Sequence, residues 1–282
     1  MSATLKLQAF LPLITYPEYD TESVVANATS LAAYLGADLH AGVFNVDIPN
    51  VSNALSRLLM RLPELIRETE TRSRTRGEQL VAMVQTEAAE RGVKLTTGTS
   101  TASPAFLAEA ATADARYFDF AILGCEAGNE ASRFAAEAIV FGSGRPTLLL
   151  PMVAKTDSFG HVAIAWDGSR VAARAVADAM PFLQRTERTT VFTVVDEKPL
   201  EDKSIAERLA ASLGRRGIAA DAISIRAEDS PIGISLQDHA LKHGADLLLM
   251  GAYGHSAVRG FILGGATEDV LDNLRMPVLC SH

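Results

Sequence analysis

The sequence predicts an α/β protein made of two tandem, doubly wound domains, each with a five-stranded parallel sheet. Three observations predict this class. Apolar runs suited to buried strands alternate with amphipathic stretches along the chain. The candidate strands are continuously apolar, as in TTVFTVV and LLLM, which is typical of strands buried on both faces of a sheet. The whole pattern occurs twice in the 282 residues.

The repeat can be followed without gaps over one helix and one strand. ASPAFLAEAATADARYFDFAILG in the first copy aligns with DSPIGISLQDHALKHGADLLLMG, 127 residues later. Each segment begins with Ser-Pro, which predicts that Ser103 and Ser230 are N-caps followed by a proline in the first helical turn. The final strands, RPTLLLP and MPVLCSH, align 131 residues apart, so the first copy is four residues shorter between these anchors.

The order of elements is expected to be the same in both copies. In the first copy, residues 1–154, strands are expected at residues 6–13, 38–46, 93–99, 118–123 and 147–150. In the second copy, residues 160–282, strands are expected at residues 161–166, 189–195, 220–226, 247–250 and 278–281. The helices of the second copy are expected at residues 170–184, 204–216, 231–243 and 267–274. Polar residues and a glycine near residues 155–160 mark the boundary.

A long addition distinguishes the first copy. Residues 51–91 are long enough for two helices, and breaks are expected near Pro63 and Gly77. The alternating charges of RETETRSRTRGE favour a solvated helix face, with a partner surface as the alternative.

Composition excludes several classes of function. The chain is 48% apolar and 21% charged, as expected for a soluble globular protein, and its formal net charge of −8 disfavours a nucleic acid partner. Because no signal-like N-terminus and no apolar run of about eighteen residues occurs, we expect a cytoplasmic protein without a membrane partner. Cys125 and Cys280 lack metal-ligand spacing, so we expect reduced, partly buried thiols and no metal site.

The segment GAYGHSAVRGFILGGAT, residues 251–267, holds five of the twenty glycines. It leaves a strand and enters a helix at the sheet edge where doubly wound folds bind ligands. Unpaired backbone N–H groups and the positive end of the helix dipole favour phosphate at such a place. Glycine allows the anion to touch the backbone, although a loop whose glycines merely turn and cap the chain is the alternative.

The glycine spacing is G-x-x-G followed by nine residues and a further glycine, so that Gly254 and Gly264 enclose HSAVRGFIL. With the helix and the Pro-Val-Leu strand that follow, this pattern resembles the nucleotide-binding signature of the universal stress protein family. HVAIAWDGSRVAARAV also resembles the opening strand, Asp-Gly-Ser turn and helix of that family. The resemblance covers most of both copies. It implies a tandem universal stress protein in which each domain has the strand order 3-2-1-4-5 of an adenine nucleotide alpha hydrolase-like fold.

The resemblance implies a regulatory ligand, ATP or a related adenine nucleotide, which magnesium could accompany. Asp167, in its turn with Gly168, and Val194 would contact the nucleoside. The residues expected at the phosphates are Gly251, Gly254, His255, Arg259, Gly264, Gly265, Ala266 and Thr267. Among these, His255 and Arg259 would reach the phosphate charge. Gly265 stands where the family usually has serine or threonine, which removes a hydroxyl donor and keeps the backbone N–H.

The first copy departs further from the family pattern. ITYPEYDTES has no Asp-Gly-Ser turn and the later glycines are absent, so we expect no nucleotide there. Asp20 is interpreted as a helix N-cap instead of a replacement for Asp167. The first copy would then serve packing or the recognition of an unidentified protein partner.

No catalytic residue is predicted, because no nucleophile with a recognisable base occurs in the sequence. Slow ATP hydrolysis is one alternative. A nucleotide-free interaction protein that acts through its surfaces is the main one. A homodimer is a family-level expectation, and whether the two fused copies pair with each other across their final strands is left open.

Overall fold

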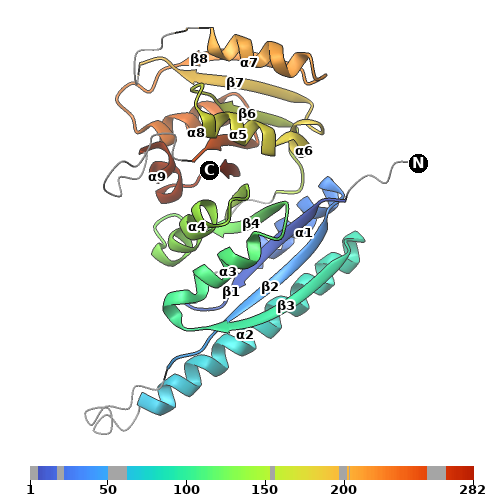
Figure 1. The fold of residues 1–282 in the computed structure, drawn as a ribbon, viewed down its shortest axis with the longest axis vertical. Coiled ribbons are helices and arrows are strands. Elements are labelled where there is room, and N and C mark those ends of the chain that lie inside the picture. The colour runs from blue at the N-terminus through green and yellow to red at the C-terminus, as the bar shows by residue number, and fades with distance from the viewer. Residues whose placement is uncertain are drawn as a thin grey trace.

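The computed structural model describes residues 6–17, 22–49, 62–152, 156–196, 202, 204–252 and 265–282. The ten expected strands form one sheet in the order β3-β2-β1-β4-β5-β10-β9-β6-β7-β8 (Figure 1). Those of the first copy are β1 (Gln8–Ile14), β2 (Asp38–Val46), β3 (Leu95–Ala102), β4 (Phe120–Cys125) and β5 (Thr147–Pro151). Those of the second copy are β6 (His161–Ala165), β7 (Arg188–Val194), β8 (Ala220–Ile225), β9 (Leu247–Gly251) and β10 (Val278–Ser281).

Helices cover both faces of the sheet, as a doubly wound fold requires. The first copy contributes α1 (Glu22–Leu35), α2 (Leu62–Arg91), the short 3-10 helix η1 (Pro104–Phe106), α3 (Leu107–Ala115) and α4 (Glu130–Gly142). The second contributes α5 (Arg170–Asp178), α6 (Met180–Leu183), α7 (Ile205–Gly214), α8 (Ile232–Lys242) and α9 (Gly265–Asp272). One apolar core lies under α1, α2, α5, α6 and α7, and the other lies under α3, α4, α8 and α9.

The expected fold class and strand order are confirmed. Within each copy all neighbouring strands are parallel, in the order 3-2-1-4-5. The two copies join where β5 and β10 pair in antiparallel fashion. Leu148 is opposite Leu279, which is its own equivalent in the repeat 131 residues later. A pseudo-two-fold axis therefore passes between these two leucines. The two copies of one chain thus pair with each other across their final strands.

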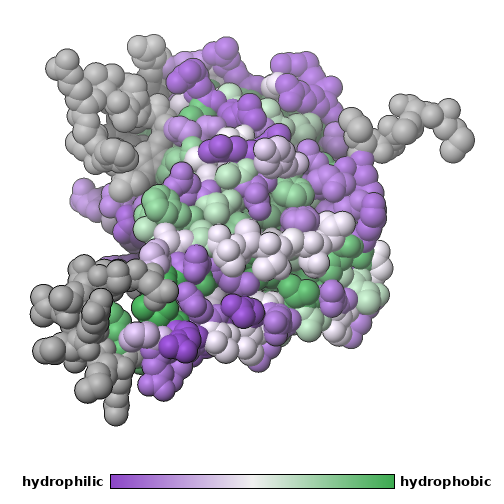
Figure 2. Space-filling model, turned by 60° about the horizontal axis from the view of Figure 1, so that its bottom comes forward, coloured by the Kyte–Doolittle hydropathy of each residue, from purple (hydrophilic) through white to green (hydrophobic). Residues whose placement is uncertain are grey.

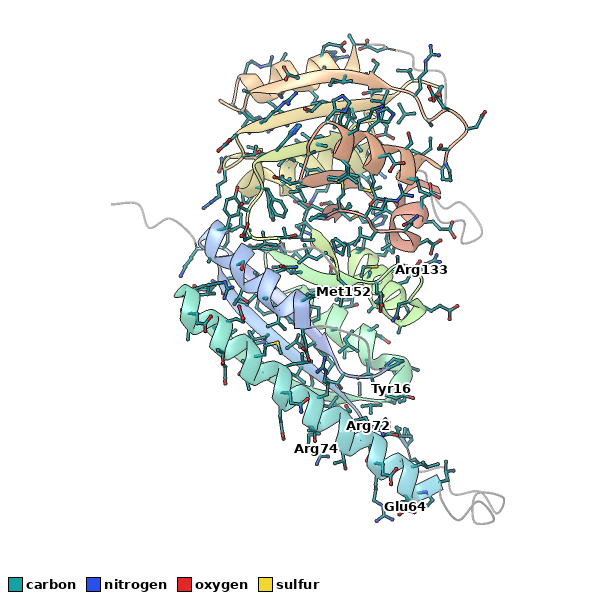
Figure 3. The ribbon with its side chains drawn as sticks, turned by 180° about the vertical axis from the view of Figure 1, so that it is seen from behind. Tyr16, Glu64, Arg72, Arg74, Arg133 and Met152 are labelled. Atoms are coloured by element: carbon teal, nitrogen blue, oxygen red, sulfur yellow. The ribbon has the colours of Figure 1, made fainter. Side chains whose placement is uncertain are left out.

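An ion-pair cluster joins the copies on one face of the sheet. Arg133 of α4, which is labelled in Figure 3, forms ion pairs with three carboxylates. Its guanidinium nitrogens are 2.5 Å from Asp272 and 3.5 Å from Glu268 of α9, and 3.3 Å from Glu137 of its own helix. Partial burial lowers the pKa of Arg133, but the three carboxylates outweigh this effect and raise it. The cluster thus fixes α4 against α9.

Aromatic rings join the copies on the opposite face. The Phe182 ring of α6 meets Phe120 of β4 edge to face, with centroids 5.6 Å apart, and lies 6.1 Å from Phe159. Tyr34 of α1 donates its hydroxyl hydrogen bond to the Phe159 carbonyl at 3.1 Å. Because Phe120 and Tyr34 belong to the first copy, this buried cluster spans the boundary between the copies.

The insertion departs from expectation. Residues 62–91 form one continuous helix where two were expected, and residues 51–61 lie outside the described residues. Gly77 does not break the helix: a Cβ there would lie 2.7 Å from Val43 Cγ1 and 2.8 Å from Asn45 Oδ1, so glycine allows α2 to approach β2 closely. Pro63 stands in the first turn, where its missing N–H costs nothing. Most of the charged stretch is exposed, as expected. The face of the molecule seen in Figure 2 carries both polar and apolar side chains.

The helix expected at residues 170–184 is also different, because it divides into α5 and α6. Ala179 separates the two, and Pro181 follows in the first turn of α6. A proline in a helix interior removes a hydrogen bond and collides with the preceding turn, so the chain starts a new helix instead.

The serine caps are not formed as expected. Ser103 precedes η1 without a capping bond from its side chain, and the N-cap of α8 is Pro231 instead of Ser230. The capping acceptor comes from another helix, since Asp269 Oδ2 of α9 accepts a hydrogen bond from Gly233 N at 3.0 Å. A carboxylate at the start of α8 also suits the helix dipole.

Both cysteines are free and buried, which agrees with the expectation of reduced thiols. Burial raises the pKa of Cys125 to about 11 and that of Cys280 to about 12. We expect neither thiol of the native protein to react with a thiol-specific disulfide reagent at about pH 8.5, the ordinary thiol pKa, whereas both react in denaturant. Rapid reaction of either native thiol would contradict the burial.

The same shifts set a pH dependence of stability. The folded chain keeps both thiols protonated, whereas the unfolded chain ionises them from about pH 8.5. The contribution of the buried thiols to the free energy of unfolding is therefore complete below about pH 8.5. It is lost as the pH rises toward the pKa values of the folded state.

Candidate functional site at the carboxyl ends of β6, β7 and β9

In the second copy, the order in which strands are added to the sheet reverses between β6 and β9. From β6 the chain continues to β7 and β8 on one side, and it returns to β9 and β10 on the other. Ligands of doubly wound sheets bind outside the carboxyl ends of the strands at such a switch point. The residues that follow β6, those that end β7 and those that begin α9 all belong to this edge. The described part of the expected nucleotide site is therefore assembled at one place in the fold.

Asp167 lies in a tight turn between β6 and α5. Its Oδ1 accepts a hydrogen bond from Ser169 N at 2.9 Å, and Ser169 Oγ accepts one from Ala172 N at 3.2 Å, which caps α5. Gly168 has a φ of 76°, a backbone conformation that residues with side chains rarely adopt. This explains the Asp-Gly-Ser sequence physically: the turn holds an exposed carboxylate at the end of β6.

Val194 ends β7, the strand next to β6. Its half-buried side chain packs against the core under α8 and α9, as does that of Ala165 at the end of β6. The edge thus has an apolar wall beside the Asp167 carboxylate. An apolar wall with one placed polar group is typical of sites for flat organic ligands.

Gly251 is required by packing. A Cβ at this position would lie 2.5 Å from both Ala172 N and Val171 C of α5, so only glycine permits this approach of strand and helix. Gly124, its equivalent in the first copy, is constrained by side chains, because a Cβ there would lie 2.3 Å from Val24 Cγ2 and 2.7 Å from Met152 Sδ. In both copies the glycine at this position therefore allows the strand to pack closely against a neighbouring helix. The expected contact of Gly251 with phosphate stays a prediction.

The start of α9 is the expected phosphate end of the site. Gly265 is its first residue and is exposed, Ala266 is half-buried and Thr267 is buried. A Cβ on Gly265 would have no described atom within 4 Å, so packing does not explain why serine or threonine is missing there. The other expected phosphate residues, Gly254, His255, Arg259 and Gly264, lie outside the described residues.

Sequence reasoning missed Asp196, which follows β7 at the same edge. Its carboxylate accepts hydrogen bonds from Ala227 N at 2.8 Å and Glu228 N at 3.1 Å, and these bonds hold its pKa below the usual range. They fix the loop before α8, in which Glu228 and Asp229 have φ values of 51° and 65°. An acidic residue directly after an apolar strand, in VVDE, is the signal that could have identified it.

The corresponding helix of the first copy begins differently. Asn129 Oδ1 accepts hydrogen bonds from Ala131 N and Ser132 N, both at 3.1 Å, and Glu126 N donates to Ser132 Oγ. Two N-terminal N–H groups of α4 are thus bonded within the protein and are not available to a phosphate. Asp20, the other residue considered in this copy, lies outside the described residues.

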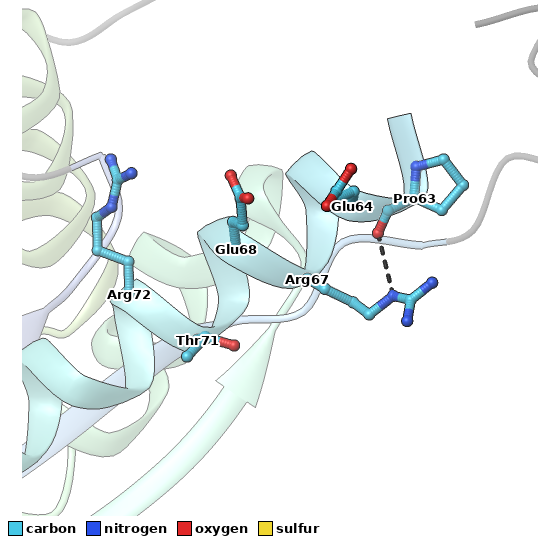
Figure 4. A pocket seen from close by; sticks show the side chains of 6 residues that line it. All are labelled: Pro63, Glu64, Arg67, Glu68, Thr71 and Arg72. Carbon is cyan, nitrogen blue, oxygen red and sulfur yellow. Dashed lines mark hydrogen bonds between the residues drawn. The ribbon is translucent and has the colours of Figure 1, made fainter. Parts of the chain in front are cut away.

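A hollow of about 780 Å³ lies along the start of α2 (Figure 4). Its described lining residues lie on one helix face, where carboxylates and guanidinium groups alternate, and Arg67 Nε donates to the Pro63 carbonyl at 3.3 Å. Among these described residues, no set of groups converges on a ligand. Elsewhere in the described ranges, no group of three or more metal-ligating side chains occurs, and no helix there is long and apolar enough to cross a membrane.

Comparison with known proteins finds a family match for the part of the chain that contains this site. Residues 158–282 match the model of the universal stress protein family. The second copy is therefore a universal stress protein domain, and the candidate site lies within it. No curated protein matches the chain.

Solved structures extend the likeness to the first copy. A universal stress protein from Archaeoglobus fulgidus DSM 4304 superposes with a TM-score of 0.71 at 16% identity, covering 96% of this chain and 97% of that one. A putative universal stress protein from Pseudomonas aeruginosa UCBPP-PA14 gives 0.60 at 16% identity, with 98% and 93% covered. A functionally unknown protein from Pseudomonas aeruginosa PAO1 gives 0.59 at 15%, with 98% and 92% covered. At such identities the likeness shows the fold, which the universal stress protein domain shares with the first copy.

Proposed function

We propose that the chain is a tandem universal stress protein of the cytoplasm that acts in a stress response. In this proposal the second copy binds ATP or a related adenine nucleotide as a regulatory ligand. One observation carries it: an exposed carboxylate, an apolar wall and the start of a helix belong to the same edge of the sheet at its switch point. In the first copy the equivalent helix is already capped by Asn129.

The residues present suit the parts of such a ligand. The Asp167 carboxylate can accept hydrogen bonds from ribose hydroxyls, and the Val194 wall suits the face of a base. The first N–H groups of α9 and the positive end of its dipole suit phosphate, for which the exposed Gly265 leaves access. Magnesium would be carried by the phosphates.

We propose binding without efficient turnover. Among the described residues of this edge, the hydroxyl of Ser169 already caps α5, and no nucleophile is paired with a base. Any slow hydrolysis of ATP would then depend only on how the site positions the phosphates.

Replacing Asp167 with asparagine is expected to weaken ATP binding about tenfold, or about 1.4 kcal/mol. Asparagine keeps an oxygen that can accept from Ser169 N, so the turn is preserved while the charge facing the ribose is lost. Asp221→Asn is the matched control, because it removes the same charge from the exposed opposite end of the strands. Isothermal titration calorimetry measures both. An equal affinity of D167N and wild type would exclude a nucleoside contact by this carboxylate.

The proposal as a whole is tested on freshly purified protein. Heating releases bound small molecules, which mass spectrometry identifies, and an adenine nucleotide is the expected result. Absence of nucleotide, together with absence of heat on titration with ATP, would overturn the proposal. The chain would then be an interaction protein that acts on a partner through its surfaces, an alternative that Gly265 and the departure of the first copy from the family pattern favour.

A further inference from the structure

The first copy has its own hollow at the edge that corresponds to the candidate nucleotide site. It measures about 510 Å³ and lies beyond the end of β1, between the start of α3 and the start of α4. We call it the β1–α4 pocket. Its lining includes Ile14, Tyr16, Leu107, Glu130 and Phe134. It therefore takes the place in the first copy that the proposed ligand takes in the second.

The walls of the pocket are mainly apolar and come from separate elements. Ile14 ends β1 and Leu107 begins α3, and both are buried. Tyr16 follows β1, where Figure 3 marks it at the end of the strand. Phe134 lies on α4 with 59% of its surface exposed, so an occupant of the pocket could cover part of its ring. The size falls within the range of about 300–1,000 Å³ found for small-molecule sites.

The polar groups of this pocket do not suit a phosphate. The N–H groups of Ala131 and Ser132 at the start of α4 are bonded to Asn129. The exposed Glu130 carboxylate adds negative charge at the same point, which would repel an anion. This carboxylate also offsets the positive end of the α4 dipole, so the start of the helix does not attract an anion. The described lining residues thus form a mainly apolar cavity in which the Glu130 carboxylate is a hydrogen-bond acceptor.

We propose that the β1–α4 pocket binds an uncharged aromatic molecule that carries a hydroxyl or N–H group as a donor to Glu130. The ring would lie against Phe134 and Leu107, where it buries apolar surface. The two copies would then take chemically different ligands at equivalent places in the fold. This proposal is independent of nucleotide binding in the second copy.

Two probes with the same ring system test the chemistry: 2-naphthalenemethanol, which is neutral with a hydroxyl, and 2-naphthoate, which is an anion. Equilibrium dialysis against the full chain is expected to show saturable binding of the alcohol, at about one molecule per chain and about tenfold more tightly than the carboxylate. Excess ATP should not displace it. Absence of saturable binding of the alcohol up to about 1 mM, preference for the anion, or displacement by ATP would overturn the proposal.

Two phenylalanines provide a matched pair of variants. Phe134→Ala removes one wall of the pocket and is expected to weaken binding of the alcohol by about fivefold or more. Phe106→Ala, at the same exposure of 59%, removes a ring that does not line the pocket and should leave binding unchanged. Because both side chains are largely exposed, both variants should fold. Glu130→Gln should reduce the preference for the alcohol over the carboxylate, and equal binding by F134A and F106A would place the probe elsewhere.

Discussion

Replacing Gly251 with valine is expected to lower the free energy of unfolding by about 3 kcal/mol, the upper part of the range for overpacking. The added Cβ would lie 2.5 Å from two backbone atoms of α5, Ala172 N and Val171 C, and backbone cannot turn away as a flexible side chain can. Either β9 or α5 must shift, and Asp167 lies in the turn that leads into α5. The expected result is therefore a loss of stability and a weakened candidate site. Urea unfolding followed by circular dichroism measures the stability.

Gly265→Ala is the control for this variant. A Cβ there meets no described atom within 4 Å, so stability should change by less than about 1 kcal/mol, with the better helix propensity of alanine acting in its favour. If G251V were as stable as G265A, the close approach of β9 and α5 would be wrong.

Phe182→Ala is expected to cost about 3–5 kcal/mol, the usual range for removing a buried phenylalanine ring. The ring is buried and contacts Phe120 of the other copy as well as Phe159. Its removal leaves a cavity at the boundary of the copies, where loss of packing weakens the contact between them. The two copies should therefore unfold less cooperatively than in the wild type.

Differential scanning calorimetry measures this effect. The wild type should give one cooperative transition, whereas F182A should show a lower and broader transition or two resolved ones. Phe106→Ala, which removes an exposed ring, serves as the control and should resemble the wild type. A wild-type transition in F182A would mean that the aromatic cluster does not hold the copies together.

Much of the fold could be predicted because its signals are local. Continuous apolar runs identify the buried strands, and β2 and β10 begin and end at the expected residues. The repeat then implies that both copies share one topology. Pairing of β5 with β10 could not be deduced, because a repeat does not specify how its copies meet. The opposition of Leu148 and Leu279 is a property of the assembled sheet.

The incorrect expectations have tertiary causes. Gly77 signals a helix break by its propensity, yet contact with Val43 and Asn45 keeps α2 continuous. Ser230 signals an N-cap, but the capping oxygen comes from Asp269 of α9. Asp269 lies 36 residues after Gly233, from whose N–H it accepts a hydrogen bond. Neither contact can be recognised from neighbouring residues alone.

At the candidate site the sequence signals are again only partly local. The Asp-Gly-Ser turn can be recognised in the sequence because Gly168 adopts a left-handed backbone conformation that is set by the turn itself. The packing role of Gly251 and the loop held by Asp196 depend on distant partners, Val171 in one case and Ala227 in the other. A glycine chosen for helix packing and a glycine chosen for phosphate look the same in a sequence.

The central claim is that the second copy binds an adenine nucleotide and the first does not. The most direct measurement is the stoichiometry of ATP binding to the full chain, by isothermal titration calorimetry with magnesium present. We expect one nucleotide per chain, with binding weakened by D167N and unaffected by E130Q in the first copy. No binding, or two equivalent nucleotides per chain, would contradict the account.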